Sequence, residues 1–327
     1  MNHTEANQSG HFLQFSCPER SVSTAVYVLL YVCAAAVVLL TVCGNLLIII
    51  SVCHFKQLHT PTNMLILSLA VSDFLVGLFV MPTALIWMIE SCWMFNRIIC
   101  ICYIITTYLL TGTSIHNVAL IAADRYFALS NPFLYARAVS VSTMCFVVLC
   151  DWCVLFSYNL VLHIVNRNFK SAVMCPGDFI ALDEVWSLVD LLVIFVFPCS
   201  VIIILYVLVF VIVKKHATAI RELNVHPSIQ TPQNDIPVKS ERKAAKVLGI
   251  VVAVFLACLF PYFIYSLLGK AIEIEEESFQ KVLILVYLNS TINPVIYALF
   301  YPWFRRCVRL TLTLQIFNTD SALMSVL

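Results

Sequence analysis

Residues 289–304 read NSTINPVIYALFYPWF and place asparagine, proline and tyrosine inside an apolar stretch of membrane-spanning length. Hydrocarbon offers no partner for the carbonyl that Pro294 leaves unbonded. Such a residue is therefore tolerated only where neighbouring helices, hydroxyls or waters satisfy the backbone. The stretch predicts a helix that faces the interior of a membrane bundle, and a bundle whose packing rearranges.

The composition is that of a polytopic membrane protein. Hydrophobic residues make up 61% of the 327 residues and charged residues only 11%, whereas about a quarter of the residues are charged in globular proteins. Seven apolar segments reach the roughly 20 residues that a helix needs to span a bilayer. They cover residues 22–52, 61–89, 99–123, 141–165, 185–213, 244–268 and 280–301. The predicted fold is an all-α, seven-transmembrane helix bundle.

Seven spans put the two ends of the chain on opposite sides of the membrane, and the distribution of charge predicts which end lies outside. Most of the 19 lysine and arginine residues follow the first, third, fifth and seventh spans, so the positive-inside rule puts the N-terminus outside the cell. We expect an extracellular tail over 1–21, a seven-span domain over 22–302 and a cytoplasmic part over 303–327. A mobile cytoplasmic loop is expected at about 216–243 within the second part.

Both ends carry candidate modification sites. Asn2 and Asn7 begin Asn-x-Ser/Thr sequons on the external tail and are predicted glycosylation sites. After Pro302 the chain is basic and amphipathic, as expected for a short eighth helix that lies on the inner membrane surface and contacts lipid. Cys307 in this helix is a palmitoylation candidate. The first span is expected to act as the targeting signal, since the tail lacks an apolar signal-peptide core.

The signature of the opening stretch recurs in a known receptor family. The matching residues are Asn289-Ser290, Asn293-Pro294, Tyr297, Tyr301 and Trp303-Phe304. With them the chain resembles trace amine-associated receptors, which are rhodopsin-like G-protein-coupled receptors, over almost its full length. Asp124-Arg125-Tyr126, at the inner end of the third span, is a second specific match. The resemblance implies a multi-pass receptor of the plasma membrane.

Residues at the inner ends of the spans carry the expected link to a heterotrimeric G protein. Arg125 and Glu241, which opens the sixth span, are placed to form an ion pair that clamps two helices together. The resemblance implies that the arginine is freed on activation and packs against the G protein, while two tyrosines swing toward it. It also implies a core trio that couples the ligand pocket to the cytoplasm. The tyrosines are Tyr206 and Tyr297, and the trio is Pro198, Ile115 and Phe255.

A polar cluster is predicted at mid-membrane around Asp73 of the second span. Ionisable residues inside membrane helices are costly and usually face a partner or a cavity. The side chains expected to converge on it are Asn45, Ser114, Asn289, Ser290 and Asn293. The resemblance implies a sodium ion here, as an allosteric modulator held by Asp73, Ser114 and Asn289, and no other cofactor. The alternative is that waters alone satisfy the cluster.

The ligand anchor is expected in the fifth span. Thr107 stands where most amine receptors carry an aspartate, eighteen residues before the arginine of the Asp-Arg-Tyr motif. Asp190 lies eight residues before Pro198, about 12 Å along a regular helix, and is the only carboxylate at pocket depth. The chain resembles a subset of fish receptors with this arrangement, which implies an amine held by Asp190 in reversed orientation.

Hydroxyl-bearing and aromatic residues at helical spacing are expected to wall an apolar pocket. They are Thr107, Tyr108 and Thr111; Tyr262, Phe263 and Ser266; and Phe279, Leu283 and Tyr287. Aromatic rings also attract ammonium ions through cation–π contacts of about 0.5–2 kcal/mol each. The sixth span reads Cys-Leu-Phe-Pro, with Leu259 where the family usually has tryptophan. Either Phe260 or Tyr262 compensates for the missing ring, or signalling depends less on it.

Most of the 14 cysteines lie within apolar spans, where a thiol behaves as a small hydrophobic group. Cys100 and Cys175 face the oxidising side of the membrane, and the resemblance implies that they form a disulfide bond. Cys17 and Cys92 are the other external cysteines. The sequence leaves open whether these two pair together or stay free.

The leading hypothesis is a G-protein-coupled olfactory receptor for small amines, which the resemblance couples to a stimulatory G protein and cyclic AMP. A class A receptor for a non-amine small molecule is the main alternative, because Thr107 removes the usual anchor and Leu259 the usual tryptophan. A transporter is more remote, since seven dissimilar spans show no inverted repeat. Diamine recognition would need a second anion, for which Asp178, Asp183 and Glu184 are the candidates.

Neither an enzyme nor a nucleic-acid partner is expected. The chain shows no nucleophile–base constellation, no Gly-rich phosphate loop and no metal-ligand spacing. His116 and His163 read as isolated side chains. Asp151, in the fourth span, reads as the donor or acceptor of a helix–helix hydrogen bond.

Overall fold

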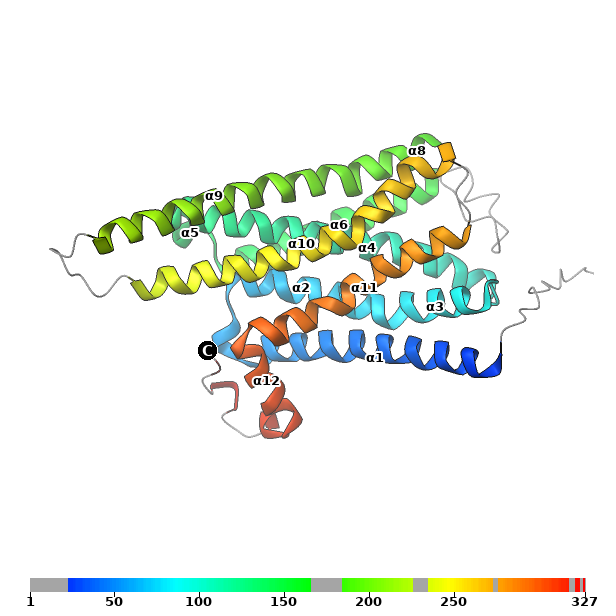
Figure 1. The fold of residues 1–327 in the computed structure, drawn as a ribbon, viewed down its shortest axis with the longest axis horizontal. Helices are drawn as coiled ribbons and strands as arrows, with labels where there is room; N and C mark the ends of the chain where they lie inside the picture. The colour runs from blue at the N-terminus through cyan, green and yellow to red at the C-terminus, as the bar shows by residue number, and fades with distance from the viewer. Residues whose placement is uncertain are drawn as a thin grey trace, which may run out of the picture.

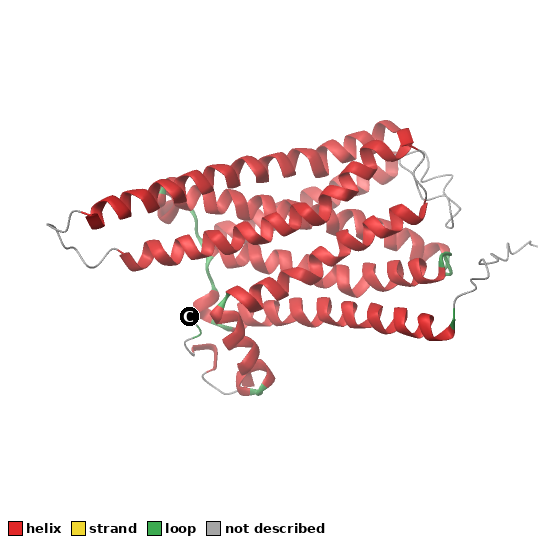
Figure 2. Cartoon of the chain, viewed as in Figure 1, coloured by secondary structure: helices red, strands yellow, loops and turns green. Residues whose placement is uncertain are grey.

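The computed structural model describes residues 23–165, 184–225, 235–272, 276–317, 321–323 and 326. These residues form helices joined by short connections, with no strand among them (Figure 2). Seven of the described helical segments are long and apolar enough to cross a membrane, which confirms the predicted seven-transmembrane bundle. They are Thr24–His54, Pro61–Glu90, Arg97–Ser130, Val141–Leu162, Leu188–Lys215, Val247–Tyr265 and Lys281–Phe300.

The long helices run side by side in one elongated bundle (Figure 1). Helix α4, Arg97–Ser130, is central, since it contacts α2 (Pro61–Leu75), α6 (Val141–Val165) and α9 (Phe197–Val225). On the other side of the bundle, α1, α10 and α11 complete the packing. Their bounds are Thr24–His54 for α1, Asp235–Ile272 for α10 and Glu276–Phe300 for α11. Residues far apart in the sequence therefore meet in the interior of the bundle.

Two spans contain a π-helical turn, which the sequence did not predict. Val76–Val80 joins α2 to α3 (Met81–Glu90), and Leu191–Val196 joins α8 (Glu184–Asp190) to α9. Each turn lies just before a proline, Pro82 or Pro198. Proline lacks an N–H and its ring collides with the carbonyl four residues earlier, so one extra residue per turn relieves the conflict. The 12 Å expected between Asp190 and Pro198 on a regular helix therefore does not apply.

Helices α1 and α11 approach closely where glycine faces proline. A Cβ atom on Gly44 would lie 2.7 Å from Cβ and 2.9 Å from Cγ of Pro294. Nearby, the buried hydroxyls of Thr41 and Thr291 are hydrogen-bonded at 2.6 Å. Small and hydroxyl-bearing residues are what allow membrane helices to pack this tightly, since lipid supplies no hydrophobic driving force between them.

We expect Gly44→Ala to destabilise the bundle. A methyl group 2.7 Å from a rigid proline ring forces the helices apart, and overpacking of this kind costs about 1–3 kcal/mol. Gly249→Ala is the matched control, because its Cβ atom would lie 3.7 Å from Tyr206 in ordinary contact. Thermal unfolding of the purified proteins in detergent should show a lower midpoint for Gly44→Ala alone. A Gly44→Ala midpoint equal to the wild-type value would show that α1 is free to shift.

Two short helices lie at the end of the bundle that carries Arg125. They are α5, Pro132–Ala138, and α12, Pro302–Leu312, which turns away from the bundle axis (Figure 1). One face of α12 is buried, with Trp303, Phe304 and Cys307, while its arginines are exposed. An amphipathic helix after the seventh span was expected from the sequence, and the structure contains one.

Cys307 is fully enclosed in this arrangement. Its side chain has no exposed area, and burial raises the pKa of the thiol to about 11. Part of the tail returns to the end of α1, where His54 and Ser321 are hydrogen-bonded at 2.9 Å and the Val326 N–H donates to Gln57 at 3.0 Å. Palmitoylation of Cys307 remains a prediction, and it requires α12 to lift away from α1 first.

Candidate functional site

A cavity of about 110 Å³ lies between α4, α8, α10 and α11 and the π turn that follows α8. Its lining residues are Thr107, Tyr108, Thr111, Ile115, Asp190, Leu191, Ile194, Phe195, Leu259, Tyr262, Leu283, Val286 and Tyr287. Most of this wall is apolar or aromatic, and the polar groups are hydroxyls and one carboxylate. Enclosed apolar cavities with a few polar groups are the usual form of small-molecule sites.

Asp190 supplies the only carboxylate among the described residues that line this cavity. It is the last residue of α8, directly before the π turn. Tyr158 of α6 donates a hydrogen bond to Oδ1 of Asp190 at 3.3 Å. This contact orients the carboxylate without neutralising it, because a neutral hydroxyl donates to the charged form. Sequence reasoning missed Tyr158, since a lone tyrosine in an apolar span gives no sign of its partner.

The opposite wall of the cavity is closed by hydroxyl groups that bond to one another. The hydroxyls of Tyr103 and Tyr287 are hydrogen-bonded at 2.7 Å across α4 and α11. Thr107 donates to the backbone carbonyl of Tyr103 at 2.6 Å. Thr107 therefore lines the cavity, as the sequence suggested, but its hydroxyl proton is already used within α4. Tyr103 is a second site residue that the sequence analysis did not single out.

The aromatic residues of α10 divide between the two sides of the helix. Tyr262 lines the cavity, and Phe263 stacks on the lining residue Phe195 with ring centroids 5.1 Å apart. Phe260 is 59% exposed and does not line the cavity. Of the two residues expected to compensate for the missing tryptophan, only Tyr262 is in place to contact a ligand. The side chains of Ser266 and Phe279 lie outside the described residues.

The predicted polar cluster around Asp73 is present and fully buried. Ser290 and Asn293 each donate to the carboxylate at 2.8 Å, and Ser114 donates at 3.4 Å. Asn45 donates to the backbone carbonyl of Ser290 at 3.1 Å. The Asp73 carboxyl group thereby joins α2, α4 and α11, and Asn45 links α1 to α11 beside it.

Beside this cluster lies a second cavity of about 20 Å³, lined in part by Ser114, Asn289 and Ser290. Oδ1 of Asn289 is buried and has no hydrogen-bond partner among the described residues. A hard cation such as sodium prefers carboxylate, hydroxyl and amide oxygens, and the space is about that of one water. The oxygen donors therefore fit the sodium ion implied by the sequence, and they fit a water equally well.

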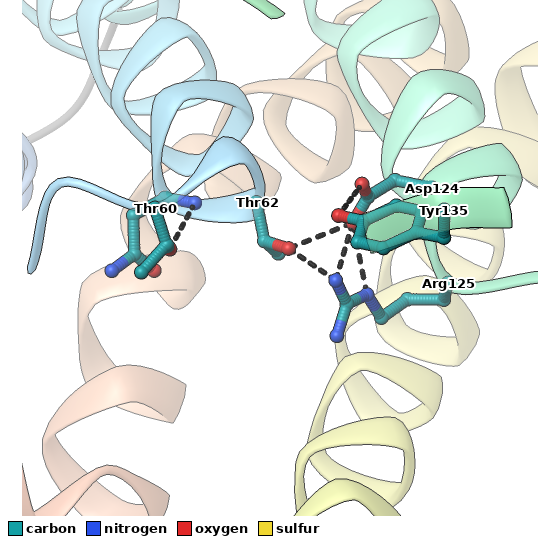
Figure 3. Close-up of polar contacts among 6 residues, drawn as sticks. Thr60, Thr62, Asp124, Arg125 and Tyr135 are labelled. Carbon is teal, nitrogen blue, oxygen red and sulfur yellow. Dashed lines mark hydrogen bonds and ion pairs between the residues drawn. The ribbon is translucent and has the colours of Figure 1, made fainter. Parts of the chain in front are cut away.

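Asp124 is held by three neighbours at the other end of α4 (Figure 3). Tyr135 of α5 donates to Oδ1 at 2.6 Å, and Thr62 of α2 donates to Oδ2 at 2.8 Å. Arg125 donates to Oδ2 from Nη2 at 2.5 Å and from Nε at 3.0 Å, and it also donates to Thr62. Burial and the bond to Asp124 raise the pKa of Tyr135 to about 12, so its hydroxyl stays a donor.

Arg125 thus bonds within its own motif and to α2. The side chain of Glu241 lies outside the described residues, so its predicted ion pair with Arg125 stays a prediction. Tyr206 and Tyr297, which are expected to swing toward Arg125, both have buried hydroxyls without a partner among the described residues. Unsatisfied buried hydroxyls are costly, so both tyrosines gain from a rearrangement that offers them a partner.

Two members of the expected core trio, Ile115 and Phe255, lie in one apolar cluster, against which Tyr206 packs. Ile115 and Phe255 are both 1% exposed and belong to the same cluster of buried side chains. Pro198 is buried beside Cys199, which joins that cluster. Tyr126 is half-buried next to Arg125. The structure therefore places Ile115 and Phe255 in one cluster that also holds Cys199, the chain neighbour of Pro198.

His116 is not isolated, and that interpretation of the sequence is wrong. Its Nδ1 lies 2.9 Å from Oδ1 of Asp151 and joins α4 to α6. Asp151 therefore forms the helix–helix contact that the sequence suggested. The partner was missed because 35 residues separate the two positions and hydropathy patterns carry no information on pairs. The side chain of His163 lies outside the described residues.

Two external cysteines are engaged in disulfide bonds. Cys92 and Cys100 are both disulfide-bonded, so Cys92 does not stay free. Cys175, the expected partner of Cys100, lies outside the described residues, as do Cys17, Asn2 and Asn7. The pairing of Cys100 with Cys175 and the two glycosylation sites therefore stay predictions.

Comparison with known proteins identifies a family over most of the chain. Residues 44–297 match the family described as 7 transmembrane receptor (rhodopsin family). Trace amine-associated receptor 13c of Danio rerio is 38% identical over 316 residues, which cover 94% of this chain and 92% of that protein. Trace amine-associated receptor 1 of Homo sapiens is 35% identical over 325 residues, 95% of each chain. Trace amine-associated receptor 4 of Rattus norvegicus is 34% identical over 324 residues, 95% of this chain and 92% of that protein.

Proposed function

Since the chain belongs to the rhodopsin family of seven-transmembrane receptors and, within it, to the trace amine-associated receptors, we propose that it detects small amines held by Asp190. Its relatives are G-protein-coupled receptors and not enzymes, so its partners are a small-molecule ligand and a G protein. The proposal adds an olfactory role, a plasma-membrane location with the N-terminus outside, and a stimulatory G protein that raises cyclic AMP.

The position of Asp190 is the observation that carries the amine proposal. It is the only carboxylate among the described lining residues, and the rest of the cavity wall is neutral. A carboxylate–ammonium contact at about 4 Å is worth roughly 4 kcal/mol at an effective dielectric of 20, before desolvation is subtracted. A cation is therefore the ligand group that this wall favours most.

The neutral wall opposite Asp190 supports the reversed orientation of the amine. Thr107, Tyr103 and Tyr287 form hydrogen bonds among themselves and offer no anion to an ammonium group. When the nitrogen of the amine lies at Asp190, its carbon skeleton extends toward α11, where the lining residues Val286 and Leu283 are apolar. Phe195 and Tyr262 offer aromatic rings along the way, and such rings also attract cations.

Transmission to the G protein is proposed through the core of the bundle. Ile115 lines the cavity and packs in one buried cluster with Phe255 and with Cys199, the chain neighbour of Pro198, so a shift at the cavity is felt in this cluster. Release of Arg125 from Asp124 would then let it meet the G protein together with Tyr206 and Tyr297. A sodium ion at Asp73, Ser114 and Asn289 would supply a positive charge that stabilises the buried carboxylate.

A ligand panel on cells that express the chain tests this proposal. Cyclic AMP is measured against monoamines, diamines, acids and neutral odorants, with receptor at the cell surface quantified in parallel. We expect a dose-dependent rise in cyclic AMP with amines and none with acids or neutral odorants. A response to acids or neutral odorants without a response to amines would overturn the amine proposal. An amine response seen by G-protein recruitment without cyclic AMP would overturn only the stimulatory coupling.

A further inference from the structure

Five side chains form the boundary between the ligand cavity and the small cavity beside Asp73, and Leu259 is the one that α10 contributes. Leu259 of α10 lines both spaces and is itself 2% exposed. The two cavities share Thr111, Ile115, Val286 and Tyr287 as well. The two cavities therefore adjoin one another, and Leu259 lies at the boundary between them.

The two sides of this boundary differ in chemistry. Above it, the cavity wall near Leu259 is apolar, with Ile115, Ile194 and Val286. Below it, the space is only about 20 Å³ and includes Asn289 and Ser290, where Oδ1 of Asn289 is a buried acceptor without a partner among the described residues. An apolar group that entered the lower space would leave that acceptor unsatisfied, which is unfavourable. An apolar ligand end therefore stops at Leu259.

We propose that Leu259 sets the length of the amine that this receptor accepts. The inference rests on the proposed function, in which Asp190 holds the ammonium group at one end of the cavity. The ligand class is then a primary amine with a single apolar body, alkyl or arylalkyl, whose far end rests on the Leu259 side chain. The distance between the Asp190 carboxylate and the Leu259 side chain then limits the length of the amine that fits.

Leu259 lines both cavities, so the size of its side chain changes the space on each side of the boundary. Leucine to alanine removes three carbon atoms and leaves a void that a longer ligand can fill. Leucine to tryptophan adds a ring that occupies space belonging to the upper cavity. Each methylene group that becomes buried raises affinity about fourfold. A substitution at Leu259 should therefore change the length of the longest amine that is still more potent than the next shorter one.

The experiment is a homologous series of n-alkylamines, from ethylamine to octylamine, on wild type, Leu259→Ala and Leu259→Trp. Cyclic AMP is measured at matched surface levels. For wild type we expect potency to rise about fourfold per methylene to a cut-off length and then to fall. The cut-off should lie at longer amines in Leu259→Ala and at shorter amines in Leu259→Trp, while ethylamine keeps its potency in Leu259→Ala.

Phe260→Ala is the matched control, because Phe260 adjoins Leu259 in α10 but lines neither cavity. It should keep the wild-type cut-off. If all variants respond to amines with one common cut-off, the role of Leu259 is overturned and the amine proposal stands. If wild type responds to no amine, the proposed function fails first and this inference falls with it. Should Leu259→Trp not reach the surface, Leu259→Ala decides the question alone.

Discussion

Asp190→Asn is expected to raise the amine concentration for half-maximal response by about 30- to 140-fold. Asparagine keeps the shape of the side chain but removes the charge that pairs with the ammonium group. The gross contact of roughly 4 kcal/mol, reduced by desolvation, leaves about 2–3 kcal/mol, and each 1.4 kcal/mol is a factor of ten. Dose–response curves for cyclic AMP, with surface receptor quantified on the same cells, provide the measurement.

Tyr158→Phe is the control for this prediction. It removes the hydroxyl that donates to Asp190 at 3.3 Å and leaves the carboxylate in place. We expect a smaller loss of potency, about three- to tenfold, because the 3.3 Å contact is long and contributes nearer the 0.5–1.5 kcal/mol of an ordinary hydrogen bond. An amine response that survives Asp190→Asn at normal potency would show that the ammonium group is held elsewhere, and the reversed orientation would be abandoned.

Asp124→Asn is expected to raise signalling without ligand by about three- to tenfold. The carboxylate of Asp124 accepts two hydrogen bonds from Arg125 and one each from Thr62 and Tyr135 (Figure 3). Asparagine can still accept from one neighbour, but it carries no charge to hold the guanidinium. Charge-assisted bonds are worth about 1.5–3 kcal/mol, which is enough to shift the population of the released state severalfold. Basal cyclic AMP per surface receptor measures the effect.

Tyr135→Phe separates the contribution of α5 from that of the charge. It removes one bond to Asp124 and leaves both bonds from Arg125 intact. The expected rise in basal signalling is therefore smaller than for Asp124→Asn. Equal basal signalling in wild type and Asp124→Asn would mean that Arg125 is restrained mainly by another partner, for which Glu241 is the candidate.

Much of the site could be anticipated because polar residues inside membrane spans are rare. Asp73, Asp190 and Arg125 stand out in an apolar sequence, and each lies at a place where the bundle has polar contacts or a cavity. Their partners were harder to predict. Tyr158 and Tyr103 belong to residue types that occur throughout the spans, so only the packing of α6 against α8 and of α4 against α11 singles them out.

Hydropathy patterns could not predict the contact between His116 and Asp151 or the two π turns. A hydropathy profile treats each span as a uniform helix, whereas Pro82 and Pro198 each follow a turn with one extra residue. Such a turn rotates every side chain before it relative to those after it. The direction in which Asp190 points therefore depends on a local distortion that spacing along a regular helix does not contain.

The sequence by itself determined the class of fold, because a membrane demands about 20 apolar residues per span and makes every polar exception conspicuous. Motifs such as Asn293-Pro294 and Asp124-Arg125-Tyr126 carried the resemblance to the family. The sequence also determined which charged residues are available to act. Only the tertiary structure decided that Leu259 lies between two cavities, that Tyr158 holds Asp190, and that Arg125 turns to Asp124 and Thr62. Most of these are contacts between helices that are distant in the chain, and for Arg125 it is the selection of one partner among several nearby groups. Both depend on how side chains pack in the interior of the bundle.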